Sequence, residues 1–200
     1  MNKLVFSILS LCIVIVSNTS CQDQNDVQEQ SKAEIVNENI LARRSIRAYT
    51  AHPVSRDTID LIMKSAINAP SARNDQPWEV RVISNPDFLA KIKTITIEPH
   101  FYDAPTLILV ANDTTKGFSA FDCGIFTQTV MLSAESYGLG TVALGMVARE
   151  LNSGTPEANA ILTELKLPDN YHIIIGIALG HKAQFPEAKP RNANKVQILE

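Results

Sequence analysis

The segment Arg43-Arg44-Ser45-Ile46-Arg47 brings three guanidinium groups and a hydroxyl within five residues of each other. A guanidinium is a rigid fork of donors that can hold a phosphate through two parallel hydrogen bonds, and a serine hydroxyl can add another. The cluster therefore predicts a site for a phosphate group. The same composition is also typical of a solvated basic patch, so the cluster alone leaves both interpretations open.

A second polar segment occupies residues 69–78, with the sequence Ala-Pro-Ser-Ala-Arg-Asn-Asp-Gln-Pro-Trp. Its two prolines restrict the backbone, while Ser71, Asn74 and Gln76 supply hydrogen-bond donors and acceptors. A rigid polar loop of this kind suits a planar ligand. It is also compatible with a helix-to-strand turn that places Trp78 in the core.

Helical patterns precede both segments. Ile40 and Leu41 open a short helix that runs into the arginine cluster and ends at a turn with Pro53. Ser55 is a suitable N-cap for a second helix, in which apolar residues recur at helical spacing until Pro70 stops the pattern. The arginine cluster is thus expected at the end of one helix, and the polar loop after the next.

The rest of the chain alternates between strand and helix patterns. Val80 and Val82 alternate with polar neighbours, and the continuous apolar run 106–111 is typical of a central strand. The later elements are expected to be a helix at 121–137 followed by Gly138, a strand at 142–147, a helix at 157–165 and a strand at 171–179. No Gly-rich dinucleotide fingerprint follows a strand, so we expect an α+β fold with packed helices rather than a Rossmann domain.

The N-terminus has the pattern of an export signal. Lys3 precedes a mainly apolar run over residues 4–16, which is shorter than the roughly 20 residues of a membrane-spanning helix. Residues 1–20 are therefore expected to be a signal peptide. Cys21 follows directly and resembles the acylated cysteine of bacterial lipoproteins, which predicts a lipid-anchored, exported protein of the cell envelope. Because Asn18 stands where that pattern has an apolar residue, cleavage without lipidation is the alternative.

Composition sets limits on the remainder of the chain. Residues 21–37 are polar and few are apolar, so they are expected to be a flexible tether to one domain at 38–200. The net charge of -3 gives no general reason to bind nucleic acid, and no metal site is expected. Cys123 has no partner cysteine in that domain, and we expect it to be a small buried apolar residue.

The arginine-serine cluster, the helix after it and the loop at 69–78 together resemble the first half of the nitroreductase family. The run 121–145, which ends in Tyr-Gly-Leu-Gly-Thr-Val-Ala-Leu-Gly, is similar to the central helix of that family and the strand after it. Gly180 and then Lys189-Pro190-Arg191 complete the series. The resemblance covers residues 40–191, and it implies a nitroreductase-like α+β fold with a mixed, mainly antiparallel sheet flanked by helices.

The resemblance also implies FMN as the cofactor and names the residues around it. Those that would meet the FMN phosphate and ribityl chain are Arg43, Arg44, Ser45, Lys189 and Arg191. Arg47 would lie beside the flavin pyrimidine, where its charge favours the anionic reduced flavin. Contacts from the partner subunit would come from Pro70, Ser71, Ala72 and Asn74, while Ala143, Leu144 and Gly145 would pass the isoalloxazine ring. Each flavin would need both chains, which implies a homodimer.

The activity implied is that of a flavoprotein oxidoreductase with a ping-pong mechanism. NAD(P)H would deliver a hydride and leave, and a nitro compound, a quinone or a similar small acceptor would then take the electrons. The flavin carries this chemistry, so no catalytic side chain is expected. Because NAD(P)H is cytoplasmic, the export signal favours an extracytoplasmic donor such as a membrane quinol. The alternatives are a lipid-anchored flavin-binding or interaction protein with little turnover, and another flavin-dependent reduction such as dehalogenation.

Access to the site is the last expectation. The connection between the strands at Val82 and Leu107 is short, whereas longer relatives place extra helices near the pocket, so a reduced lid is expected. Within this connection His100, Phe101 and Tyr102 either line the pocket or form a loop that packs on the core.

Overall fold

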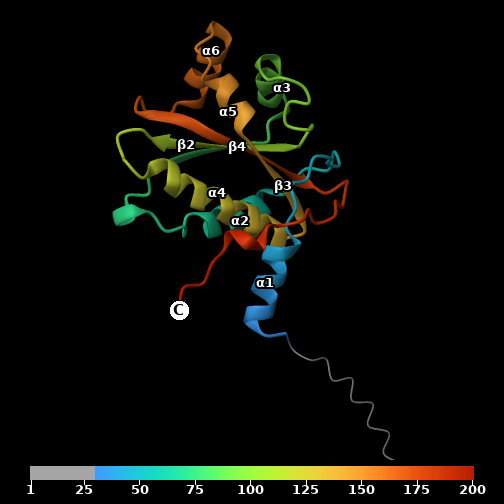
Figure 1. Cartoon of the computed structure of the whole chain (residues 1–200). Coiled ribbons are helices and arrows are strands. Elements are labelled where there is room, and N and C mark those ends of the chain that lie inside the picture. The colour runs from blue at the N-terminus through green and yellow to red at the C-terminus, as the bar shows by residue number, and fades with distance from the viewer. Residues whose placement is uncertain (1–29) are drawn as a thin grey trace, which may run out of the picture. The chain divides into compact units, whose positions relative to one another are not determined.

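A four-stranded sheet forms the centre of the molecule in this computed structural model, which describes residues 30–200 (Figure 1). The strands are β1 (Trp78–Ile83), β2 (Thr106–Asp113), β3 (Leu139–Leu144) and β4 (Tyr171–His181). Their order is β1-β2-β4-β3, and every neighbouring pair is antiparallel. The predicted signal peptide and Cys21 lie outside the described residues.

Helices cover both faces of the sheet. On one face lie α2 (Arg56–Ala66) and α4 (Ser119–Ser136), and on the other lie α3 (Pro86–Ile95), α5 (Gly145–Leu151) and α6 (Pro156–Leu165) (Figure 1). Successive residues of β2 point to opposite faces, so Leu107 and Leu109 pack with α3, α5 and α6, whereas Ile108 and Val110 pack with α2 and α4. The expected α+β fold, with helices flanking a mainly antiparallel sheet, is confirmed.

The first helix differs from its prediction at both ends. α1 spans Lys32–Ala42, so it begins inside the segment expected to be a tether and ends before the arginine cluster. Its sequence has no glycine or proline, which permits a helix although none of its residues is buried. No helix among residues 30–200 is long and apolar enough to cross a bilayer.

One strand boundary and one helix were not predicted correctly. The strand expected at 142–147 ends at Leu144, because the chain turns into α5 and buries Val147, Ala148 and Leu151 in the same core. The helix α3 was missed within the connection before β2. Asn85 caps it by accepting a hydrogen bond from the Phe88 amide, and this local signal was present in the sequence.

An almost enclosed ion pair links the end of β4 to the last turn of α4. Lys182 Nζ lies 2.6 Å from Glu135 Oε1, and the two side chains are only 14% and 10% exposed. Removing one partner leaves the other charge largely out of water without compensation, so Glu135→Ala should lower the free energy of unfolding by about 2 kcal/mol. Urea unfolding measures this change.

The matched control is Glu164→Ala, which breaks the exposed pair between Glu164 and Lys91. Because water screens that pair, its loss should cost about 0.5 kcal/mol or less. Equal effects of the two substitutions would show that burial of the Lys182–Glu135 pair adds nothing to the free energy of unfolding.

Candidate functional site

The arginine cluster lies on an extended segment along one edge of the sheet. The Ile46 amide donates to the Thr141 carbonyl at 2.9 Å, and Ser45 forms a parallel bridge with Thr141 of β3. Further on, the Thr50 amide donates to the His181 carbonyl at 3.0 Å. The segment therefore runs from the start of β3 to the end of β4, and these hydrogen bonds hold the arginine cluster against β3.

A glycine makes this close approach possible. Ile46 is fully buried, and a Cβ atom added to Gly140 would lie 2.8 Å from the Ile46 Cβ. Real Cβ contacts are not that short, so β3 accepts the segment only because residue 140 has no side chain.

Arg44 has the most distinctive environment in the cluster. Its Nη1 donates to the carbonyls of Leu41, Ala42 and Arg43, which are the free carbonyls at the end of α1. Its Nε is buried and has no hydrogen-bond partner within the described part of the chain. An unsatisfied buried donor costs about 1–3 kcal/mol, so this Nε is a position where an anionic ligand would be stabilised.

Arg47 is exposed and lies against an aromatic ring. Its Cζ is 5.9 Å from the centroid of the Tyr102 ring, within the range of a cation–π contact. Phe101, by contrast, is completely buried among core residues. His100 Nε2 lies 2.9 Å from Glu98 Oε1. Each of the two interpretations of residues 100–102 therefore fits one residue: Phe101 packs in the core, while Tyr102 contacts Arg47, a predicted cofactor residue.

The end of β3 offers an accessible stretch of backbone two residues beyond Thr141. Ala143 is exposed in a strand whose other residues are buried, and Leu144 after it is buried. Gly145 is exposed, and a Cβ atom added there would meet no atom within 4 Å. A flat ligand could therefore approach this backbone, at the same sheet edge as the arginine cluster.

The polar loop between α2 and β1 is held in an unusual conformation. Arg73, Asn74 and Gln76 have positive φ angles of 57°, 58° and 47°. The Gln76 amide donates to Ser71 Oγ at 3.0 Å, and the Ala72 amide donates to Asp122 Oδ2 of α4 at 3.1 Å. Asp122 was not singled out from the sequence, because an acidic residue in a helix carries no local signal of such a contact.

The two predicted halves of the site contact α4 at different positions. The polar loop is tied to α4 at Asp122, whereas Asn39, just before the arginine cluster, donates to the Leu132 carbonyl at 3.0 Å. These anchors are ten residues apart, which is about 15 Å along a helix axis. Within residues 30–200 no hydrogen bond or ion pair joins Pro70–Asn74 to Arg43–Arg47.

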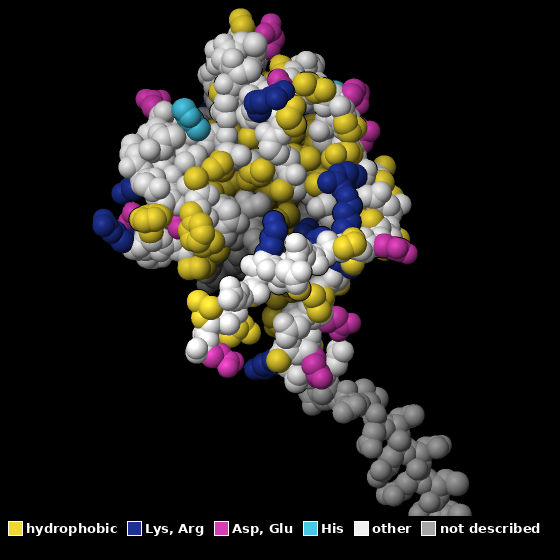
Figure 2. Space-filling view, in the orientation of Figure 1, with side chains coloured by type: hydrophobic (Ala, Val, Ile, Leu, Met, Phe, Trp, Pro, Cys, Tyr) yellow, Lys and Arg dark blue, Asp and Glu magenta, His cyan; other side chains and the backbone are white. Residues whose placement is uncertain are grey.

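The C-terminal tail carries the last two predicted residues. Lys189 and Arg191 are exposed, and among the described residues Arg191 Nη1 donates only to the carbonyls of Lys189 and Pro190 in its own segment. Figure 2 shows Lys and Arg side chains gathered on the part of the visible face where the segment 43–50 and this tail run. The structure does not bring Lys189 or Arg191 into contact with Arg44.

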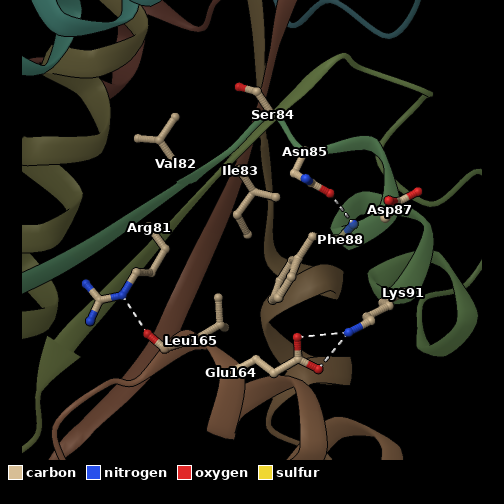
Figure 3. Close-up of a pocket in the computed structure, with 10 residues that line it drawn as sticks. All are labelled: Arg81, Val82, Ile83, Ser84, Asn85, Asp87, Phe88, Lys91, Glu164 and Leu165. Atoms are coloured by element: carbon tan, nitrogen blue, oxygen red, sulfur yellow. Dashed lines mark hydrogen bonds and ion pairs between the residues drawn. The ribbon is translucent and has the colours of Figure 1, made fainter.

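A pocket outside the predicted site lies along the edge strand β1 (Figure 3). It has a volume of about 600 Å³ and contains none of the predicted site residues. Three of its charged side chains are engaged in contacts: Arg81 Nε donates to the Leu165 carbonyl at 2.7 Å, and Lys91 lies 2.8 Å from Glu164. These contacts hold β1, α3 and α6 together.

Comparison with known proteins agrees with this arrangement of segments. The nitroreductase family model matches residues 40–99 and 96–181. The chain belongs to the nitroreductase family. The matched ranges include the arginine cluster, the polar loop and the end of β3, and they stop before Lys189 and Arg191.

Individual relatives and solved structures extend the comparison. The "Putative NADH dehydrogenase/NAD(P)H nitroreductase" of Methanothermobacter thermautotrophicus is 34% identical over 165 residues, which covers 78% of this chain and 81% of that protein. The FMN reductase [NAD(P)H] of Bacillus subtilis is 30% identical, over 74% of this chain and 66% of that protein. A nitroreductase from Bacteroides fragilis with bound FMN has a TM-score of 0.73 and 27% identity, covering 82% of this chain and 98% of that one.

Proposed function

We infer that this protein is an FMN-dependent oxidoreductase, and we propose that it reduces nitro compounds, quinones or similar small acceptors. Family membership, relatives named as FMN reductases and similar structures with bound FMN support the cofactor and the reaction class. The observation in this chain that carries the proposal is the buried Nε of Arg44, which lacks a partner among residues 30–200 and lies at the sheet edge that ends in exposed Ala143.

The residues along this edge fit the parts of FMN. Arg43, Arg44 and Ser45 would hold the phosphate, because guanidinium forks match its oxygens. Arg47 would lie by the pyrimidine ring and stabilise negative charge there, with Tyr102 supporting its guanidinium. The isoalloxazine would rest on the backbone of Ala143, Leu144 and Gly145. When bound, FMN supplies the two-electron transfer between donor and acceptor, and these side chains bind and orient it.

We propose that two copies of the chain complete each site. Pro70, Ser71, Ala72 and Asn74 would contact the flavin of the partner subunit, which explains why this loop and the arginine cluster lie apart on α4. α1 supports the same proposal, because Ile35, Val36, Ile40 and Leu41 are exposed on it. Analytical ultracentrifugation should give twice the mass of one chain, and a monomer that binds FMN would contradict the shared site.

The location and the donor are proposals as well. Residues 1–20 would be removed on export and Cys21 would carry the lipid, so the domain would act in the cell envelope. The tail residues Lys189 and Arg191 would approach the FMN phosphate on cofactor binding. Because nicotinamide cofactors are cytoplasmic, we propose a membrane quinol as the physiological donor.

Absorbance of the purified mature protein tests cofactor and donor together. We expect visible flavin absorbance that is lost when a soluble quinol analogue is added and that returns with a nitroaromatic compound or a quinone. NADPH in a parallel sample measures the nicotinamide activity, and free FMN with the same quinol is the control. A colourless protein that takes up no FMN would contradict the cofactor assignment, whereas a yellow protein inert to quinol would contradict only the donor.

A further inference from the structure

The carboxylate of Asp122 is a buried group that the proposed function does not use. Asp122 lies in the first turn of α4 and is only 3% exposed. Its Oδ2 accepts the backbone amide of Ala72, which is 50 residues away in the sequence. A carboxylate this deeply buried needs hydrogen bonds to be tolerated, and its place near the helix N-terminus is electrostatically favourable.

The loop that Asp122 holds has little else to fix it. Arg73 and Gln76 adopt left-handed backbone conformations that cost side-chain-bearing residues about 1 kcal/mol or more each, so surrounding contacts must maintain them. The hydrogen bonds from the amides of Asn74, Asp75 and Gln76 all end within the loop. Apart from the Trp78 amide, which donates to the Gln76 carbonyl, the hydrogen bonds and ion pairs that link residues 71–76 to the rest of the described fold are the Asp122 hydrogen bond and an exposed ion pair.

That ion pair is the weaker of the two links. Lys116 Nζ lies 3.7 Å from Asp75 Oδ2, and the two side chains are 48% and 33% exposed. Water screens such a pair, and its net contribution is small. The buried hydrogen bond from Ala72 to Asp122 is therefore the contact that sets the position of the loop relative to α4.

We propose that Asp122 is a positioning residue for the cofactor site: its carboxylate holds the Ala72 amide and thereby orients Ser71 and Asn74 toward the flavin of the partner subunit. The proposal rests on the proposed function, because it assumes that this loop contacts FMN. We assign Asp122 no direct contact with the cofactor or the reactants. Its effect reaches the flavin through the backbone of residues 71–74.

Three substitutions separate position from charge. Asp122→Asn removes the charge but keeps a side-chain oxygen that can accept the Ala72 amide. Asp122→Glu keeps the charge but displaces the oxygen by one methylene, and Asp122→Ala removes the acceptor. The dissociation constant of FMN for each apoprotein, measured by flavin fluorescence, should rise about tenfold for Ala and Glu and less than threefold for Asn.

The control variant is Lys116→Ala, which removes the exposed link to Asp75 and should leave FMN affinity within about twofold. Thermal unfolding of each apoprotein reports effects on folding separately. If Asp122→Ala does not fold, the contrast between Asn and Glu carries the test.

The outcomes distinguish the possible failures. Wild-type FMN affinity in the folded Ala and Glu variants, with only a lower unfolding temperature, would overturn the proposal and leave Asp122 a structural residue. Equal losses in Asn and Glu would also overturn it, because the hydrogen bond would not be the cause. A wild-type protein that binds no FMN would overturn the proposed function itself.

Discussion

Replacing Arg44 with alanine is expected to weaken FMN binding by about 100-fold, the largest effect on cofactor affinity that the structure predicts. The Arg44 Nε is buried and lacks a partner among the described residues, so a bound phosphate would gain a charge-assisted hydrogen bond there without displacing an existing one. Nη1 already donates to the carbonyls at the end of α1, which holds the guanidinium in place before the ligand arrives. Flavin fluorescence titration of the apoprotein measures the affinity.

Two further variants define the reason for this loss. Arg44→Lys keeps the charge but loses the fork, so it should show an intermediate loss of about tenfold. Arg56→Ala is the matched control, because Arg56 on α2 is 83% exposed and, within residues 30–200, pairs only with Asp60 of the same helix. Unchanged FMN affinity in a folded Arg44→Ala variant would mean that Arg44 serves only to cap the end of α1, and it would remove the main support for the phosphate site.

Replacing Gly140 with alanine is expected to lower the free energy of unfolding by about 3 kcal/mol. The new Cβ would lie 2.8 Å from Ile46 Cβ, Cγ1 and Cγ2. Rotating the Ile46 side chain cannot relieve the contact with its Cβ, and the Ile46 backbone is held to Thr141 by a 2.9 Å hydrogen bond. The segment must therefore shift as a whole, which thermal unfolding should register as a drop of roughly 6–12 °C.

The same substitution at Gly124 is the control with the opposite sign. Gly124 lies inside α4, and a Cβ atom added there would meet nothing within 4 Å. Alanine should therefore stabilise that helix by about 0.5–1 kcal/mol. Because Ile46 lies between Arg44 and Arg47, Gly140→Ala should also weaken FMN binding, and a stable variant with full affinity would contradict the close packing described above.

Local sequence patterns predicted the elements whose ends are marked by single residues. Ser55 caps α2 through its side chain, as its position before the apolar repeat indicated. Gly138 adopts a φ angle of 72° after α4, as expected for a residue that ends a helix. The run 106–111 is a buried central strand. Cys123 is buried and forms no disulfide among residues 30–200, and burial raises the pKa of its thiol to about 12.

Other boundaries depended on contacts between distant residues. α1 ends at Ala42 and not beyond the arginine cluster, because the following segment pairs with β3 and β4 instead. β3 ends at Leu144 because the chain continues as the helix α5, which buries Val147 and Ala148 in the core. Neither the pairing of the segment after α1 nor the burial of α5 can be read from neighbouring residues alone.

Some features of the candidate site were likewise predicted from the sequence, and others depended on the tertiary structure. The order and spacing of the motifs predicted which segments belong to the cofactor site, and the assignment of individual residues to FMN stays a prediction. The contacts of Asp122 with Ala72 and of Tyr102 with Arg47 became visible only in the tertiary structure.

By itself, the sequence determined the class of ligand to expect, because guanidinium, hydroxyl and amide groups at given spacings limit the ligands that can bind. It also determined most helices and strands, since periodicity and capping are properties of neighbouring residues. Only the tertiary structure decided that Arg44 Nε is buried without a partner among the described residues, that Gly140 must lack a side chain and that the polar loop is held at Asp122. Those features depend on distances between segments far apart in the chain, which packing alone sets.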